Sequence, residues 1–190
     1  SILPAFTEHV CREALEPSDG QASNRYLIDA YCGSGLFALS CASRFDQVSG
    51  IEISDAAIDW AKRNAQLNQI DNCRFEQGDA LAIFENATFP PDQTAVVIDP
   101  PRKGSNPGFI DQLLAFAPAT IVYVSCNPAT QIRDLQQLLA DGTYQLSKVQ
   151  PFDLFPQPRH LECVVTLNQP PPSPLLPPCP YPLTLAPPTP

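Results

Sequence analysis

Cys126 is the side chain of this 190-residue chain whose position best suits covalent chemistry. It follows the apolar segment 120–124 and Ser125, and Asn127-Pro128 comes directly after it. A strand that stops there presents its thiol at the carboxyl edge of a sheet, where open α/β folds bind ligands. Such a thiolate can act as a nucleophile, although most buried cysteines are inert small hydrophobes. The neighbouring motifs must decide between the two.

A second motif, Asp99-Pro100-Pro101-Arg102-Lys103-Gly104, follows the apolar run 95–98. Two prolines fix the backbone and remove two donors, so this loop is rigid and holds the Asp99 carboxylate in place. Arg102 or Lys103 could stabilise a thiolate or a phosphate. The alternative is a stiff surface turn.

Glu162 lies at the end of a third motif, residues 152–162, and directly before the apolar run Cys163-Val164-Val165. Burial there would raise the pKa of the carboxyl group, and Glu162 could then serve as a general base. Taken alone, it could equally be a solvated glutamate at the end of a strand.

Asp29-Ala30-Tyr31-Cys32-Gly33-Ser34-Gly35 forms a turn after the first apolar segment. Its two glycines allow a tight turn and close approach of a ligand at the start of a helix. Glu52 comes about 20 residues later, where an acidic side chain can accept hydrogen bonds from ribose hydroxyls. The pair indicates an adenosine-containing cofactor, with NAD and S-adenosylmethionine both open, because Ala38 at the third position does not exclude NAD.

Apolar periodicity predicts that strands and helices alternate. We expect strands at 26–28, 47–53, 73–76, 95–98, 120–124, 149–154 and 161–167, and helices at 2–15, 36–44, 56–69, 107–116 and 129–140, with a short one after Gly78-Asp79-Ala80 up to Phe84. Ser54-Asp55 can cap the third helix. We expect Ile132, Leu135, Leu138 and Leu139 on the buried side of the last one. The order predicts an α/β fold, with a mostly parallel sheet covered by helices on both faces and an antiparallel edge hairpin.

Composition limits the domain to roughly the first 168 residues. The segment 170–190 holds eleven of the 23 prolines and no charged residue. We expect one folded domain at 1–168 and a Pro-rich, disordered tail at 169–190. The net charge of −9 argues against strong binding of a polyanion by this segment alone, because phosphate contacts need Lys and Arg.

The seven cysteines (11, 32, 41, 73, 126, 163 and 179) are odd in number and show no C-x-x-C spacing. With only two histidines present, we expect no metal site. We interpret the cysteines as free thiols, which predicts a reducing, intracellular setting. No apolar run reaches the roughly 20 residues of a membrane span, so we expect no membrane partner.

At these motifs the chain resembles the S-adenosylmethionine-dependent RNA uracil-5-methyltransferases, which make 5-methyluridine in tRNA and rRNA. The runs DAYCGSG (29–35), GIEIS (50–54), DPPRKG (99–104), YVSCNPAT (123–130) and FDLFPQPRHLE (152–162) occur in the family's order and spacing. The resemblance covers about residues 1–167, and it is strongest to the eukaryotic and fungal tRNA branch. It implies a Rossmann-like class I methyltransferase fold.

The resemblance also implies a role for each matching position. Cys126 would be the nucleophile and Glu162 the general base. Tyr31, Gly33, Gly35, Glu52, Asp79 and Asp99 would form the S-adenosylmethionine site: Tyr31 and the two glycines would shape the pocket, Glu52 would hold the ribose, Asp79 would lie near the adenine, and Asp99 would face the cofactor and the target base. The implied substrate is tRNA, and we expect a monomer.

Family members carry an amino-terminal RNA-binding region and a glutamine-containing cofactor segment ahead of the matching part. Neither is present here, so we expect this segment to fold like the catalytic domain but to bind cofactor and RNA poorly alone. Three alternatives stay open: an rRNA uracil-5-methyltransferase, a non-catalytic RNA-binding module, and an NAD-dependent oxidoreductase.

Overall fold

The computed structural model describes residues 2–16, 23–79, 83–84, 88–155 and 160–170. Seven strands form one sheet in the order β3-β2-β1-β4-β5-β7-β6. Their bounds are β1 Tyr26–Ala30, β2 Gln47–Glu52, β3 Cys73–Gln77, β4 Thr94–Ile98, β5 Thr120–Ser125, β6 Gln145–Phe155 and β7 His160–Asn168. β1 to β5 pair in parallel, whereas β7 runs antiparallel to β5 and β6 antiparallel to β7. The predicted parallel sheet with an antiparallel edge hairpin is confirmed.

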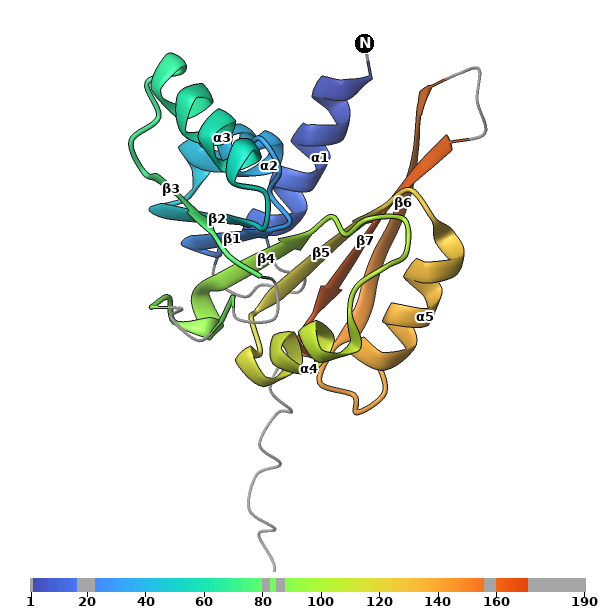
Figure 1. Cartoon of the computed structure of the whole chain (residues 1–190). Coiled ribbons are helices and arrows are strands. Elements are labelled where there is room, and N and C mark those ends of the chain that lie inside the picture. Colours follow the sequence, from blue (N-terminus) through green and yellow to red (C-terminus); the bar gives the residue numbers. More distant parts are fainter. Residues whose placement is uncertain (1, 17–22, 80–82, 85–87, 156–159, 171–190) are drawn as a thin grey trace, which may run out of the picture.

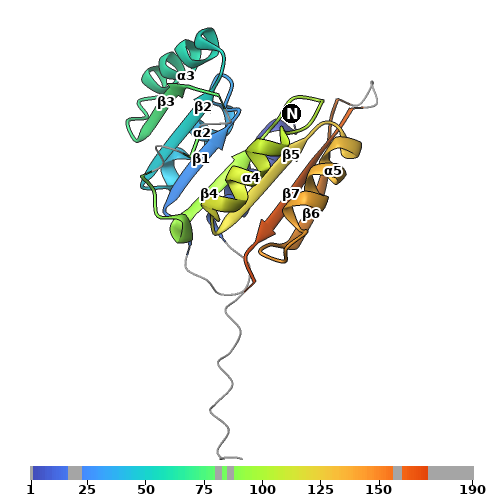
Figure 2. The same cartoon turned by 60° about the horizontal axis from the view of Figure 1, so that its bottom comes forward.

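Helices cover both faces of the sheet, as predicted (Figure 1). α1 (Leu3–Leu15), α2 (Leu36–Cys41) and α3 (Asp55–Leu67) contribute Phe6, Phe37 and Ile58 to one core. α4 (Pro107–Phe116) and α5 (Pro128–Leu138) contribute Phe109 and Leu138 to the other, and Figure 2 looks onto the face that they cover. Short 3-10 turns at Ala42–Arg44 and Pro91–Gln93 complete the regular elements of the described residues.

The central strands β4 and β5 are mostly hydrophobic because both of their faces are covered. Every residue of β4 and β5 is buried, which is typical of a parallel sheet between two helical layers. This burial fixes the central strands and therefore the loops that leave their carboxyl ends.

Side-chain caps start three helices directly after loops. Ser54 Oγ accepts a hydrogen bond from the Ala57 N–H, which confirms the predicted cap of α3. Asn106 and Asn127 cap α4 and α5 in the same way, each followed by a proline in the first turn. The last two caps end the loops after β4 and β5, so the sequence itself defines where those loops stop.

The prediction for the buried side of the last helix is wrong at Ile132. Its side chain is 58% exposed, whereas Gln131 and Asp134 are each 3% exposed. Both polar side chains face hydrogen-bond partners on neighbouring strands and loops. These partners satisfy the polar groups, so the helix turns its polar residues inward at this point.

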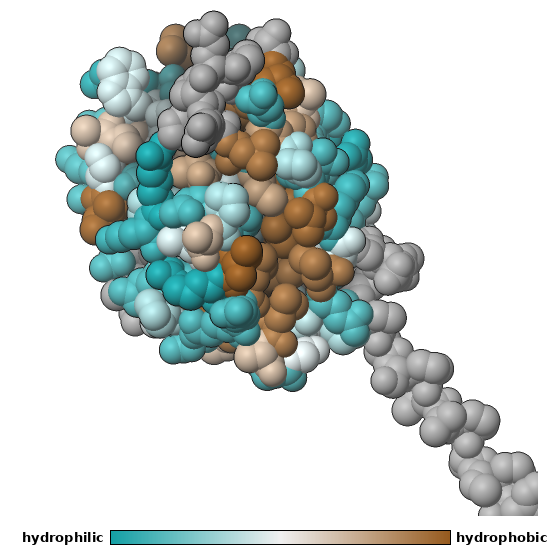
Figure 3. Space-filling view, turned by 90° about the vertical axis from the view of Figure 1, so that its right-hand side faces the viewer, coloured by the Kyte–Doolittle hydropathy of each residue, from teal (hydrophilic) through white to brown (hydrophobic). Residues whose placement is uncertain are grey.

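The molecule has an apolar side where β6, β7 and α5 lie. β6 begins four residues before the predicted start and forms an outer edge of the sheet. Leu146 and Val149 of β6, Leu161 of β7 and Ile132 of α5 are between 43% and 58% exposed. Figure 3 shows the apolar surface gathered on this side of the molecule.

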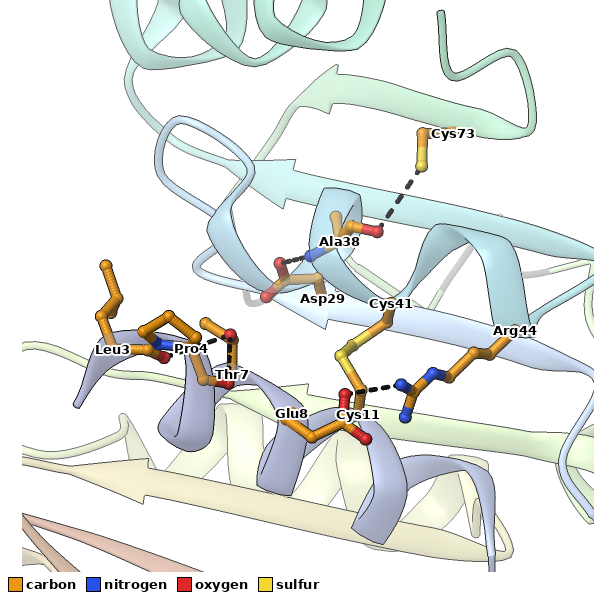
Figure 4. Close-up of a disulfide and its surroundings, with 10 residues drawn as sticks. All are labelled: Leu3, Pro4, Thr7, Glu8, Cys11, Asp29, Ala38, Cys41, Arg44 and Cys73. Atoms are coloured by element: carbon orange, nitrogen blue, oxygen red, sulfur yellow. Dashed lines mark hydrogen bonds and ion pairs between the residues drawn. A yellow bond between two sulfur atoms is a disulfide. The ribbon is translucent and has the colours of Figure 1, made fainter. Parts of the chain in front are cut away.

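The interpretation of all cysteines as free thiols is wrong for Cys11 and Cys41. Their sulfur atoms form a disulfide between α1 and α2, with Cα atoms 5.1 Å apart (Figure 4). The odd count and the absence of a C-x-x-C motif could not reveal this pair, because the two positions are 30 residues apart and meet only when the helices pack. Cys32, Cys73, Cys126 and Cys163 are free.

Some predictions lie outside the described residues: the short helix up to Phe84 falls largely on 80–82, and most of the Pro-rich tail falls on 171–190. β7 ends at Asn168, and the division into a domain at 1–168 and a tail stays a prediction. In the part of the chain that the structure describes, no helix has the length and apolar character needed to cross a bilayer.

Candidate active site at the carboxyl edge of the sheet

Three adjacent strands deliver their terminal residues to one edge of the sheet. β1, β4 and β5 are parallel neighbours, so Tyr31, Asp99 and the residues after Ser125 leave the sheet on the same side. β7 runs the other way and begins at that edge with Glu162 among its first residues. The fold therefore gathers all four predicted motifs at one edge.

Strand register brings Cys126 and Glu162 to the same end of one strand pair. Ser125 of β5 is paired with Cys163 of β7. Cys126 and Glu162 are the residues just beyond this pair, so both lie at the same end of the β5–β7 ladder. The fold thus brings the predicted nucleophile and the predicted base to one end of a strand pair, although they are 36 positions apart in the sequence.

Asp99 is the third member of this group. Burial and, to a smaller extent, the nearby negative charge of Glu162 together raise the pKa of its carboxyl group to about 7. The two carboxyl groups are therefore close enough to interact. At neutral pH, Asp99 exists in both protonation states and can accept or donate a hydrogen bond.

A cavity of about 580 Å³ opens beside Asp99, and Cys126 and Glu162 are not among the residues that line it. Four of the six predicted cofactor residues line it: Tyr31, Glu52, Asp79 and Asp99. Gly33 and Gly35 do not. The remaining lining residues are Ile51, Ile53, Gly78, Ile83, Pro101, Lys103, Gly104 and Asn106.

Gly33 instead supports a residue that lines the cavity. Its backbone N–H donates to Glu52 Oε2 (3.2 Å), and the Ser54 N–H donates to Oε1 (3.0 Å). These bonds fix the Glu52 carboxylate and leave acceptor capacity on both oxygens. Gly33 and Gly35 have positive φ angles of 52° and 92°, a backbone conformation that glycine adopts without strain.

Tyr31 has a φ of 64°, which is uncommon for a residue with a large side chain. Its ring packs edge to face against Phe109, with centroids 5.4 Å apart. Burial raises the pKa of the phenol to about 12, so the hydroxyl remains neutral. The strained turn and the ring contact together place a fixed hydroxyl-bearing ring on the cavity wall.

Asp29 lies beneath the same turn and was not predicted as a site residue. It is fully buried, and its Oδ2 accepts a hydrogen bond from the Ala38 N–H (2.8 Å) in α2. Burial raises the pKa of this carboxyl group to about 8. Its place directly before the glycine turn was the available sequence signal.

The loop after β4 is held by α5. Asn127 Nδ2 donates to the Arg102 carbonyl (2.9 Å), and Arg133 Nη2 donates to the Lys103 carbonyl (3.2 Å). Asp134 Oδ2 accepts from the Ser105 N–H (2.7 Å). The helix that follows Cys126 therefore anchors the loop that carries Asp99 and Lys103, a role that the sequence pattern of α5 did not indicate.

The lining combines isoleucine side chains with a few fixed polar groups, the usual make-up of a small-molecule site. Ile51 and Ile53 flank Glu52 at the end of β2, and Ile83 lines the same cavity. Sequence reasoning missed these residues, although their position beside Glu52 could have suggested them. Among the described residues, no three His, Cys, Asp or Glu side chains gather closely enough to hold a metal ion.

Comparison with known proteins gives a family match over most of the chain. The sequence model described as tRNA (Uracil-5-)-methyltransferase matches residues 7–86 and 91–170. These ranges contain every candidate residue described above.

Two fungal relatives are similar over 89% of this chain. Both bear the name tRNA (uracil(54)-C(5))-methyltransferase; the one from Schizosaccharomyces pombe is 44% identical and the one from Saccharomyces cerevisiae 40% identical. The matched part covers 33% and 27% of those proteins. The chain thus spans about a third of the length of the curated relatives that it matches.

A solved structure supports the same likeness in three dimensions. It is the tRNA (uracil-54, C5)-methyltransferase of Pyrococcus abyssi in complex with S-adenosyl-L-homocysteine, with 30% identity and a TM-score of 0.70. The similarity covers 86% of this chain and 37% of that one.

Proposed function

The chain belongs to the tRNA (uracil-5-)-methyltransferase family, and on that premise we propose that it is a catalytic domain that transfers a methyl group from S-adenosylmethionine to carbon 5 of a uridine in tRNA. The observation that carries the proposal is that the ends of β4 and β5 and the start of β7 lie at one edge of the sheet, where Asp99 lines a cavity of cofactor size and is close enough to Glu162 for its charge to act on it. A thiol, a carboxylate and a methyl-donor site are the three parts that this reaction needs.

The cavity fits S-adenosylmethionine in the chemistry of its wall. Ile51, Ile53 and Ile83 offer apolar surface to a purine, and Glu52 keeps acceptor capacity for ribose hydroxyls. Asp79 would lie near the adenine. Tyr31, with Gly33 and Gly35 behind it, would shape the pocket, and Asp99 would face both the cofactor and the target base. When bound, S-adenosylmethionine supplies an electrophilic methyl group.

Cys126 begins the proposed reaction as a thiolate that adds to carbon 6 of the uracil ring. The ring becomes an enolate, and its carbon 5 would take the methyl group while the methyl–sulfur bond breaks and the sulfur leaves as a neutral thioether. Glu162 then removes the proton from carbon 5. The electrons of that C–H bond restore the ring double bond, and the Cys126 thiolate leaves.

Lys103 lines the cavity and would provide positive charge close to the reacting groups. Asp99, with its raised pKa, can share a proton with its surroundings at neutral pH. The target base must leave its stack to reach this edge.

Trapping with 5-fluorouracil-substituted tRNA tests the proposal, with the full-length protein. Fluorine at carbon 5 cannot leave as a proton, so the covalent adduct should persist on a denaturing gel. We expect an adduct with the wild type and none with Cys126→Ala. The matched control is Cys163→Ala, which removes a neighbouring free thiol and should still give the adduct. Absence of an adduct in the wild type would refute the covalent mechanism.

We propose uridine 54 of tRNA as the target, by likeness to the relatives whose names specify that position. Methylation assays on separate tRNA and rRNA pools, followed by mapping of 5-methyluridine, distinguish this from an rRNA substrate.

Calorimetric titration with S-adenosylmethionine and with NAD tests which cofactor the protein binds, and binding of NAD alone would exclude the methyltransferase reaction. The monomeric state and the intracellular setting stay predictions.

A further inference from the structure

We propose that Gln131 is a positioning residue that holds the strand of Glu162 against the strand of Cys126, and that it thereby governs the removal of the carbon 5 proton. This inference rests on the proposed function. It assigns Gln131 no contact with the substrate; Gln131 acts through the two strands.

Gln131 lies in the first turn of α5 and is 3% exposed. Its side-chain Nε2 donates two hydrogen bonds, to the Tyr123 carbonyl of β5 (3.1 Å) and to the Cys163 carbonyl of β7 (3.0 Å). An NH₂ group has two hydrogens, so this one amide group uses both to connect the two strands.

The connection lies close to the proposed chemistry. Val124 and Val164 are a register pair of β5 and β7. Tyr123 precedes Val124, and Cys163 precedes Val164, so Gln131 bridges diagonally across this pair. Glu162 is directly before one bridged residue, and Cys126 is three positions after the other. A small shift between the strands here would displace Glu162 relative to Cys126.

A polar residue is costly at this buried position. An amide taken out of water costs free energy unless its hydrogen bonds are replaced, and Ile132, the next residue, is left 58% exposed. The helix therefore places an amide, rather than the adjacent isoleucine, against the junction of β5 and β7. This arrangement is what a bridge between the strands requires.

Cys126 has a separate support. The Ser125 Oγ accepts from the Asn127 N–H (3.0 Å), and Asn127 Nδ2 donates to the Arg102 carbonyl (2.9 Å). These bonds hold both neighbours of Cys126 in the absence of the Gln131 bridge. Loss of the bridge should therefore leave addition of the thiolate to carbon 6 intact and disturb the position of Glu162.

The consequence is a change in which step limits turnover. Glu162 must take the carbon 5 proton before the bond between carbon 6 and the Cys126 sulfur can break. If Glu162 is displaced, methyl transfer still occurs but elimination slows. The methylated RNA then accumulates on Cys126, even with ordinary uridine.

The test uses Gln131→Met in the full-length protein, since methionine has a similar length and no N–H donor. We expect turnover on unmodified tRNA to fall about ten- to a hundredfold, the size of effect that a small misplacement of a reacting group produces. A covalent protein–RNA complex with ordinary uridine should appear on a denaturing gel. The rate of trapping by 5-fluorouracil tRNA should stay within about twofold of the wild type.

Two further variants control the experiment. Gln136→Met changes an exposed glutamine of the same helix and should behave as the wild type. Gln131→Asn keeps the amide on a shorter side chain and should accumulate less adduct than Gln131→Met. If Gln131→Met shows no cooperative melting transition, turnover and adduct formation are measured with Gln131→Asn instead.

The inference is overturned if turnover is unchanged in both Gln131 variants, or if it falls without any adduct on ordinary uridine. Failure of the proposed function would look different, because the wild type itself would then not trap 5-fluorouracil tRNA.

Discussion

Asp29 shows how a single residue supports the site without belonging to it. Its carboxyl group is fully buried beneath the glycine turn and bonds to the start of α2. Burial raises its pKa to about 8, and the nearby charges of Asp99 and Glu52 act in the same direction. The protonated form is therefore the stable one in the folded protein at neutral pH.

We predict that Asp29→Asn flattens the fall of stability with rising pH. The pKa of the folded state (about 8) exceeds the reference value of 3.8, so the folded protein binds a proton that the unfolded chain has lost. The free energy of unfolding must then decrease as pH rises from about 4 to about 8, by at most about 1.4 kcal/mol per pH unit. Asparagine has no such proton and can still accept from Ala38.

Urea unfolding at pH 5 and at pH 8 measures this effect. Asp59→Asn, which changes an exposed aspartate of α3, is the control and should keep the wild-type slope. Equal slopes for Asp29→Asn and the wild type would show that the buried carboxyl group is ionised in both states.

The disulfide is the clearest feature at the scale of elements. It joins α1 to α2, and α2 begins at Leu36 directly after the turn that supports Glu52. An ion pair between Glu8 and Arg44 lies along the same contact (Figure 4). α1 is thereby fixed to the part of the sheet that shapes the proposed cofactor site.

We predict that reduction lowers the free energy of unfolding by about 3 kcal/mol, because the bond closes a loop of 30 residues and restricts the unfolded chain. Chemical unfolding with and without reductant measures it. A Cys11→Ala/Cys41→Ala double variant should no longer respond to reductant. A wild type with the same stability under both conditions would contradict the presence of the bond.

α5 also matters as an element. Its buried side carries Gln131 and Asp134, which bind the strands and the loop around the site. A helix that directly follows the proposed nucleophile thus connects Cys126, the Asp99 loop and the strand of Glu162.

At the scale of the whole molecule, the order of the strands decides where the site forms. β1, β4 and β5 lie side by side in the centre, and the hairpin of β6 and β7 closes one end (Figure 2). β4 and β5 are fully buried, whereas β6 and β3 form the two outer edges. Rigid central strands therefore carry Asp99 and Cys126, while Glu162 comes from the hairpin.

We predict a matching gradient of hydrogen exchange. Peptides from β4 and β5 should exchange only through global unfolding, because local opening would expose their buried residues. β6 should exchange earlier, since it has an open edge and half-exposed Leu146 and Val149. Exchange measured by mass spectrometry tests this, with β3 as the comparison edge strand. Uniform protection across all seven strands would contradict it.

The sequence by itself determined the alternation of strands and helices, because apolar periodicity follows directly from burial on one face or on two. It also determined the motifs at the strand ends. The residue types of Asp99, Cys126, Glu52 and Glu162, together with their immediate sequence neighbours, are enough to predict their chemistry. Caps such as Ser54 were readable for the same reason: they depend on neighbours within three positions.

Only the tertiary structure decided which distant residues meet. The placement of Cys126 and Glu162 at one end of the same strand pair follows from the register of β5 and β7, and the Cys11–Cys41 bond follows from the packing of α1 on α2. The burial of Gln131 in place of Ile132 depends on carbonyl groups of two other strands. Such partners lie far away in the sequence, so no local pattern can specify them; packing of the whole sheet does.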